Sequence, residues 1–277
     1  MRGWHGAVLG MAAFGILGFV PQAWPQDDVT IASYRKAIAY NAEDVIAHFN
    51  LGLALYKQGR YDEAEQSLRD ALRVNRGDED AHDQVDGPAY QLLGIIHYNH
   101  HEDDRRALDA LRKSLRHAPD DPDTYYAMGL AHQRLKDWRR ALEAFDEAVA
   151  HGRRNDADLH VRRGTVLLEL DETEKAVAAY RRALEIKSDS LAALENLAML
   201  YHRLDRSEEA LALLRELVRL EPMNFNANYL LGLHAYKQKD YAQMVKAFTR
   251  AVAIKPEHAD AHFNLGMAYY FQTRYDL

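Results

Sequence analysis

The chain has 277 residues, of which 48% are hydrophobic and 28% are charged, and this apolar content excludes an intrinsically disordered protein. Its formal net charge of −7 lacks the basic surplus that binding to a phosphate backbone requires, so we expect no nucleic acid partner. The absence of cysteine excludes disulfides, thiol nucleophiles and thiolate metal sites.

The first 26 residues have the layout of a secretory signal peptide. Arg2 precedes an apolar run over residues 7–20, which is followed by the helix-ending sequence PQAWPQ. The run is shorter than the roughly 20 residues that a membrane-spanning helix needs, which favours cleavage. Ala23 suits the last residue of a signal peptide, whereas Pro21 is not the small residue expected two places earlier. We expect an exported protein, periplasmic or secreted, with an uncleaved membrane anchor over 1–26 as the alternative.

The rest of the chain carries an internal repeat with a period near 34 residues. The phrase HFNLGLALYKQGRYDEA at 48–64 returns as HFNLGMAYYFQTRYD at 262–276. Each copy has a small residue at an equivalent position, and these are Gly52, Gly94, Gly129, Gly164, Ala198, Gly232 and Gly266. In most copies a second small residue follows, so two helices can approach closely at this pair of positions. A fixed period of this length indicates an array of helix pairs.

The predicted array opens on a half unit and continues with complete ones. Tyr34 and Ala37 fit the second helix of a unit that has no first helix, so residues 27–44 form a half repeat. Six complete units are predicted over 45–258, and they begin at Val45, Gly87, Pro122, Ala157, Leu191 and Phe225.

Two departures interrupt this regularity. An acidic insertion near 79–86, which we expect to be a loop, separates the first two units, and Pro88 marks the boundary after it. The seventh unit, over 259–277, supplies a first helix only. A lone first helix leaves Leu265 and Tyr269 without the packing that a complete repeat provides.

These units resemble the tetratricopeptide repeat family. The sixth unit has the family's leucine, glycine, aromatic, alanine and proline residues in the expected order, at Leu231, Gly232, Tyr241, Phe248, Ala251 and Pro256. The resemblance covers nearly everything after residue 26. It implies an all-α fold, a right-handed superhelical solenoid of helix-turn-helix repeats, and a role in protein–protein interaction.

The resemblance also implies where a partner would bind. In the family the first helices line a concave groove, and the second, fifth, sixth, ninth, twelfth and thirteenth positions of each unit point into it. Aromatic residues at such positions here are Phe49, Tyr56, Tyr98, Tyr126, Tyr229, Tyr236, Phe263 and Tyr270. An aromatic groove would bind an extended or helical peptide by burying its apolar side chains. Packing between neighbouring helices is the alternative role for each residue.

Three asparagines share the sixth position of their units, namely Asn50, Asn196 and Asn264. A side-chain amide can donate to and accept from a peptide backbone without reading its side chains. The arrangement resembles the asparagine ladder in the repeat arm of O-linked N-acetylglucosamine transferase, although the other four units have no asparagine there. A local packing preference is the alternative explanation.

The best candidate for chemistry is the segment HYNHHEDD, at residues 97–104. His97, His100 and His101 precede three acidic residues, and imidazole and carboxylate groups are ligands for zinc or similar ions. However, His97 occupies a core position of the repeat, the rest lies in a predicted turn, and no motif such as HExxH is present. We therefore expect no enzyme activity, no catalytic residue, and no metal or cofactor.

The sequence thus predicts a scaffold or adaptor that binds a protein or peptide partner in its groove, in the assembly of an envelope complex. One alternative is a structural protein that forms homo-oligomers through its C-terminal end. The other is the non-catalytic arm of a larger enzyme such as a glycosyltransferase. Membrane contact is expected only if the N-terminal segment stays uncleaved.

Overall fold

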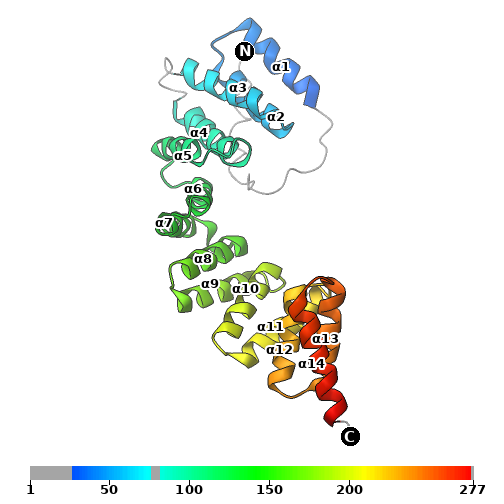
Figure 1. The fold of residues 1–277 in the computed structure, drawn as a ribbon. Coiled ribbons are helices and arrows are strands. Elements are labelled where there is room, and N and C mark those ends of the chain that lie inside the picture. Colours follow the sequence, from blue (N-terminus) through cyan, green and yellow to red (C-terminus); the bar gives the residue numbers. More distant parts are fainter. Residues whose placement is uncertain (1–26, 76–81, 276–277) are drawn as a thin grey trace. The chain divides into compact units, whose positions relative to one another are not determined.

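The computed structural model describes residues 27–75 and 82–275, and every regular element in these residues is a helix (Figure 1). The all-α class expected from the sequence is confirmed for this part of the chain. The expected signal peptide over 1–26 lies outside it. No helix among the described residues combines the length and the apolar character needed to cross a membrane.

The helices fall into two compact units, and the chain passes from one to the other within the short 3-10 helix η2 (Arg153–Asn155). The first unit contains α1 (Asp27–Tyr40), α2 (Val45–Lys57), α3 (Tyr61–Val74), α4 (His82–Asn99), α5 (Asp104–His117), α6 (Pro122–Arg134) and α7 (Trp138–Ala150). The second contains α8 (Ala157–Glu169), α9 (Thr173–Ile186), α10 (Leu191–Arg203), α11 (Ser207–Leu220), α12 (Phe225–Lys237), α13 (Tyr241–Ile254) and α14 (Ala259–Tyr275).

Helices that follow one another in the sequence pack as pairs. The pairs are α2 with α3, α4 with α5 and α6 with α7 in the first unit, and α8 with α9, α10 with α11 and α12 with α13 in the second. In addition, α1 packs on α2 and α14 packs on α13. Each unit is therefore a stack of helix pairs with an extra helix at one end.

Polar caps fix where the first helix of a pair begins. A side-chain oxygen of the preceding residue accepts a hydrogen bond from a backbone N–H in the first turn, which satisfies a donor that has no partner within the helix. The capping residues are Asp44, Asp121, Asp156, Ser190 and Asn224, for α2, α6, α8, α10 and α12 respectively. These five helices begin at the residues from which the repeats were counted in the sequence.

A glycine on the first helix lets the second helix approach closely. A Cβ atom built on Gly129 would lie 2.4 Å from a ring carbon of Phe145, on α7, which is far too close for two carbon atoms. Equivalent contacts join Gly52 to Leu68, Gly94 to Leu111, Gly164 to Tyr180 and Gly232 to Phe248. The large partner side chains are fully buried, so glycine and its partner together fill the centre of each of these five pairs.

The turn inside each pair requires a left-handed backbone conformation. One residue per turn has a φ between 50° and 76°, and these residues are Gly59, Glu102, Lys136, Asp171, Asp205 and Lys239. Glycine adopts this conformation without steric cost, whereas the other five carry a Cβ atom that disfavours it. The turns of five repeats therefore store a small amount of strain.

The predicted loop before the second repeat is wrong for residues 82–86, because α4 begins at His82. Val85 is buried among apolar residues of the first unit, so the helical face of α4 extends one turn further back. Asp86 is buried too, and it accepts a hydrogen bond of 2.8 Å from Asn75 Nδ2. Pro88 consequently lies inside α4 and not at its boundary. Residues 79–81 lie outside the described part of the chain.

The expectation for the last helix is half right. Leu265 does have packing partners, because it lies against a cluster that includes Ala235, Met244 and Phe248, so the prediction for this residue is wrong. Tyr269, in contrast, is exposed. A Cβ atom on Gly266 would meet nothing within 4 Å, unlike that on the other repeat glycines of α2, α4, α6, α8 and α12.

Candidate partner-binding surface

Three of the aromatic residues predicted to line the groove are exposed, and together they define the aromatic surface: Tyr236 on α12, and Phe263 and Tyr270 on α14. Their exposed fractions are 47%, 68% and 53%. Large apolar side chains on rigid helices are what a partner can bury at little cost in side-chain entropy. These three are the predicted groove aromatics that the structure leaves exposed.

The aromatic surface is held in place by ring contacts beneath it. Phe271 stacks on Tyr241 with ring centroids 5.2 Å apart, and its ring lies 5.8 Å from Tyr236 and 5.5 Å from Tyr270. Phe271 was missed in the sequence interpretation. It occupies the thirteenth position of its unit, which the family pattern assigns to the groove, so a signal for it was present.

Other predicted groove residues are covered, and Tyr126 is the clearest correction. Only 3% of Tyr126 is exposed, because the guanidinium of Arg153 lies 3.9 Å from its ring centroid and Phe145 packs beside it. Tyr98 is half-buried under the guanidinium of Arg134, at 3.9 Å. Tyr126 is therefore closed to a partner, and one face of the Tyr98 ring is covered.

The remaining aromatic residues of the prediction are half-buried. Phe49 and Tyr56 pack against the apolar core of the first unit. Tyr229 stacks on Phe225, and burial raises its pKa, which keeps its hydroxyl protonated. These residues support the helices, which is the alternative role that the sequence left open.

The three predicted asparagines are all half-buried, and the structure separates them by their hydrogen bonds. Asn264 donates from Nδ2 to the hydroxyl of Tyr229 at 3.2 Å, so its amide is partly used inside the protein. The side chains of Asn50 and Asn196 form no hydrogen bond to other described residues, and Asn50 and Asn196 lie in different units. Of the two predicted asparagines in the second unit, Asn196 is therefore the one whose side-chain N–H donors and oxygen acceptor are all available to a partner.

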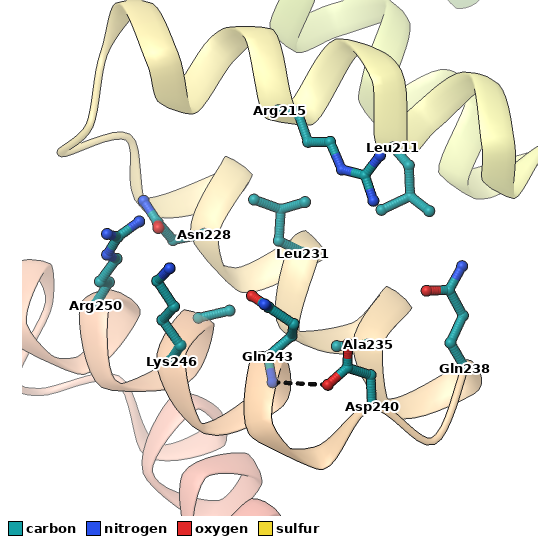
Figure 2. A pocket seen from close by; sticks show the side chains of 11 residues that line it. Leu211, Arg215, Asn228, Leu231, Ala235, Gln238, Asp240, Gln243, Lys246 and Arg250 are labelled. Carbon is teal, nitrogen blue, oxygen red and sulfur yellow. Dashed lines mark hydrogen bonds between the residues drawn. The ribbon is translucent and has the colours of Figure 1, made fainter.

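A shallow cavity of about 290 Å³ lies between α11, α12 and α13 (Figure 2). Figure 2 shows Arg215 reaching toward the cavity from α11, and Lys246 and Arg250 lining it from α13. Among the described residues, none of these three cations pairs with a carboxylate. Asp240 is the acidic residue of the lining, and it accepts a hydrogen bond from the backbone N–H of Gln243 as the cap of α13. The sequence interpretation missed this basic cavity, because it considered only the first helices of the pairs.

The histidine-rich segment does not form the cluster with neighbouring acids that its sequence offers. Asp103 caps α5, and Asp104 pairs with an arginine of α6. The ring of His100 stacks on a tyrosine of α3, with centroids 3.2 Å apart. His101 instead lies 3.0 Å, from Nε2 to Oε2, from Glu65 of α3, which is far away in the sequence.

Comparison with protein families identifies the repeat. The sequence model of the tetratricopeptide repeat matches residues 29–82, 126–190 and 195–256. Among curated proteins, DnaJ homolog subfamily C member 3 of Gallus gallus is 24% identical over 212 residues. The match covers 70% of this chain and 36% of the relative, so the chain spans about a third of that protein's length.

Solved structures share the architecture. The C-terminal part of a TPR repeat-containing protein from Cytophaga hutchinsonii has a TM-score of 0.69 at 14% identity, over 85% of this chain and 93% of its own. YrrB, described as a TPR protein with an unusual peptide-binding site, has a TM-score of 0.52 at 20% identity, over 84% of this chain and 97% of its own. At such identities the likeness shows the fold.

Proposed function

The chain belongs to the tetratricopeptide repeat family, a family of protein-interaction scaffolds, and on that premise we propose that it binds a segment of a partner protein on the aromatic surface of α12 and α14. The observation that carries the proposal is the exposure of Tyr236, Phe263 and Tyr270 on adjacent helices. Aromatic residues of this kind dominate the binding energy of protein interfaces. The peptide-binding site named for the structurally similar YrrB supports the same class of function.

The geometry favours a partner segment with apolar side chains spaced along it. The three rings are presented by helices, which hold them at fixed separations, so a helical or extended segment can bury one side chain against each ring. Tyr236 and Tyr270 also carry hydroxyl groups that can donate to or accept from a partner backbone. Recognition by the proposed surface therefore combines apolar burial with a few polar contacts, and it needs no cofactor.

We place this function in an exported protein that takes part in assembling an envelope complex. The basic and apolar pattern at residues 1–26 supports export. Fractionation of cells that express the full chain tests the placement, with the size of the mature protein as the second readout. Recovery of the unprocessed chain in the cytoplasm would contradict it.

Self-association is a second candidate, and a separate observation favours it. Tyr269 is 49% exposed on α14, and the backbone beside it at Gly266 is uncovered. Another copy of the chain can pack on this side of α14 without using the aromatic surface. Sedimentation of the chain at increasing concentration, with and without Tyr269→Glu, measures this contribution by itself.

A pull-down from envelope extract tests the partner-binding proposal. The baits are the unmodified chain, the double variant Tyr236→Ala with Tyr270→Ala, and the control Tyr40→Ala, which changes a tyrosine that is 96% exposed on α1. We expect a protein that the unmodified and control baits retain and the double variant loses, at unchanged helicity. Equal capture by all three baits would overturn the assignment of the surface.

A further inference from the structure

Two histidines and a glutamate from different repeats meet in the first unit. Glu65 lies on α3, His97 near the end of α4, and His101 in the turn that follows α4. One potential ligand atom from each of the three lies within 4.8 Å of the other two. His97 Nε2 is 3.8 Å from Glu65 Oε1, and His101 Nε2 is 3.0 Å from Glu65 Oε2.

We propose that Glu65, His97 and His101 bind a divalent transition-metal ion, for which Zn²⁺ is the probe. Two imidazole nitrogens and a carboxylate oxygen are a donor set that zinc accepts, and they leave a position for water or a further ligand. Zinc binds such atoms at about 2.0–2.2 Å, so ligand atoms on one ion lie roughly 3–3.6 Å apart. Small side-chain rotations bring the observed separations into that range. This inference departs from the sequence-based expectation of no metal.

His97 is buried, and its ring nitrogens make few interactions with the rest of the protein. Its side chain is only 7% exposed, and its buried Nδ1 has no hydrogen-bond partner in the described structure. Its Nε2 lies beyond hydrogen-bond distance from Glu65. His97 Nε2 therefore has no hydrogen bond to Glu65 that an ion would have to break. Burial lowers the pKa of His97, which favours the neutral imidazole that a metal requires.

Two neighbouring charged groups determine how strongly the ion is held. Arg69 Nη2 pairs with Glu65 Oε1 at 2.5 Å, so an ion must displace an arginine whose side chain is 54% exposed and free to turn into solvent. Asp62 Oδ1 lies 3.8 Å from His101 Nε2 on a side chain that is 94% exposed, and it can approach as a fourth ligand. A bound ion would join the second helix of the first repeat to the second repeat.

Calorimetric titration of the full chain with Zn²⁺ tests the proposal. We expect one tight site, and we expect Glu65→Gln and His101→Gln each to weaken it by at least about tenfold. The matched control is His151→Gln, because His151 is 28% exposed, close to the 29% of His101, and also contacts two carboxylates at 3.4 and 3.5 Å without a second histidine. This control should leave the affinity unchanged.

Two further variants keep the test decisive. His97→Leu should remove the tight site without unfolding the protein, because Leu55 and Leu167 occupy the equivalent position in other repeats and are buried there. Arg69→Gln should tighten binding by freeing Glu65. Substitution of Co²⁺ gives visible absorption bands that imidazole ligation intensifies in the unmodified chain and not in His101→Gln.

The proposal would be overturned by an affinity for Zn²⁺ that His101→Gln and His151→Gln lower equally, since binding would then be spread over surface histidines. Absence of any site tighter than that of a peptide with one histidine would overturn it as well. Neither result affects the aromatic surface, which lies in the other unit and contains none of these residues.

Discussion

Tyr126 in the first unit and Phe263 in the second occupy the same fifth position of their repeats, and their surroundings are opposite. Tyr126 is 3% exposed beneath Arg153, whereas Phe263 is 68% exposed. Tyr229, at the same position of the sixth repeat, is intermediate, because His258 and Asn264 lie against it. The position in the repeat fixes the direction of the side chain, and residues that come later in the chain, such as Arg153 for Tyr126 and Asn264 for Tyr229, decide whether it is covered.

This comparison separates two kinds of residue that look alike in the sequence. Aromatic residues of the first unit at groove positions contribute to stability, because neighbouring side chains bury them. The exposed rings on α12 and α14, those of Tyr236, Phe263 and Tyr270, are the ones that we propose for recognition. If substitutions at the two kinds of residue changed stability equally, the distinction between them would be contradicted.

The largest difference is expected between Tyr126→Ala and Tyr270→Ala. Removal of the buried ring should lower the free energy of unfolding by about 3 kcal/mol, since it leaves a cavity under Arg153. Removal of the exposed ring should change it by less than about 0.5 kcal/mol. Urea denaturation followed by circular dichroism measures both, and similar losses in the two variants would contradict the distinction.

The second difference concerns two glycines. Gly129→Ala should lower the free energy of unfolding by about 1–3 kcal/mol, because its Cβ would overlap the ring of Phe145. Gly266→Ala should raise it by up to about 1 kcal/mol, because alanine favours a helix and nothing lies within 4 Å of the new atom. Thermal unfolding of the two variants checks the signs, and a loss in Gly266→Ala would show an unseen contact at α14.

Both units contain a buried histidine, so the stability of both should depend on pH. Burial lowers the pKa of His132 in the first unit and of His234 in the second. In the unfolded chain these histidines have the ordinary histidine pKa of 6.5, so at lower pH the unfolded chain binds more protons than the folded protein. The free energy of unfolding is therefore highest above pH 6.5 and falls as the pH drops below it. Urea unfolding between pH 7.5 and about 5 should show this slope.

The control for this pH dependence is His132→Leu, which replaces a buried imidazole with an apolar side chain found at the same position in other repeats. Its stability should depend less on pH over the same range. A slope equal to that of the unmodified chain would show that His132 does not carry the effect.

The smallest effect is expected at the strained turns. Lys136→Gly and Lys239→Gly, one in each unit, should each raise the free energy of unfolding by about 0.5 kcal/mol, because both lysines have a φ of 58° and glycine relieves the Cβ conflict. Neither lysine forms an ion pair among the described residues. Gly59→Ala is the reverse control and should destabilise, so a gain in that variant would refute the explanation.

Much of the fold was predictable, because each repeat encodes its own local signals. The caps Asp44, Asp121 and Asp156, together with the small residues that allow close packing, fix the helix starts. The start of α4 was not predictable in the same way. Val85 is a single apolar residue among polar ones, and its burial depends on the three-dimensional surroundings of α4.

The candidate sites were less predictable, because they combine residues from different repeats. Position numbers named Tyr236, Phe263 and Tyr270 correctly as exposed, but they could not reveal that Arg153 covers Tyr126. Glu65 is separated from the histidines by almost one repeat, so no local spacing connects it to them. Two of the acids that follow the histidines, Asp103 and Asp104, are used for capping and pairing.

The central claim is that the aromatic surface of α12 and α14 contacts a partner protein. Its most direct test is photo-crosslinking in cells, with a photoreactive amino acid placed at position 263 or 270, and at position 40 as the exposed control. The account predicts a crosslinked product with one other protein from positions 263 and 270 and none from position 40. Crosslinks only between copies of this chain, or equal yields from all three positions, would contradict it.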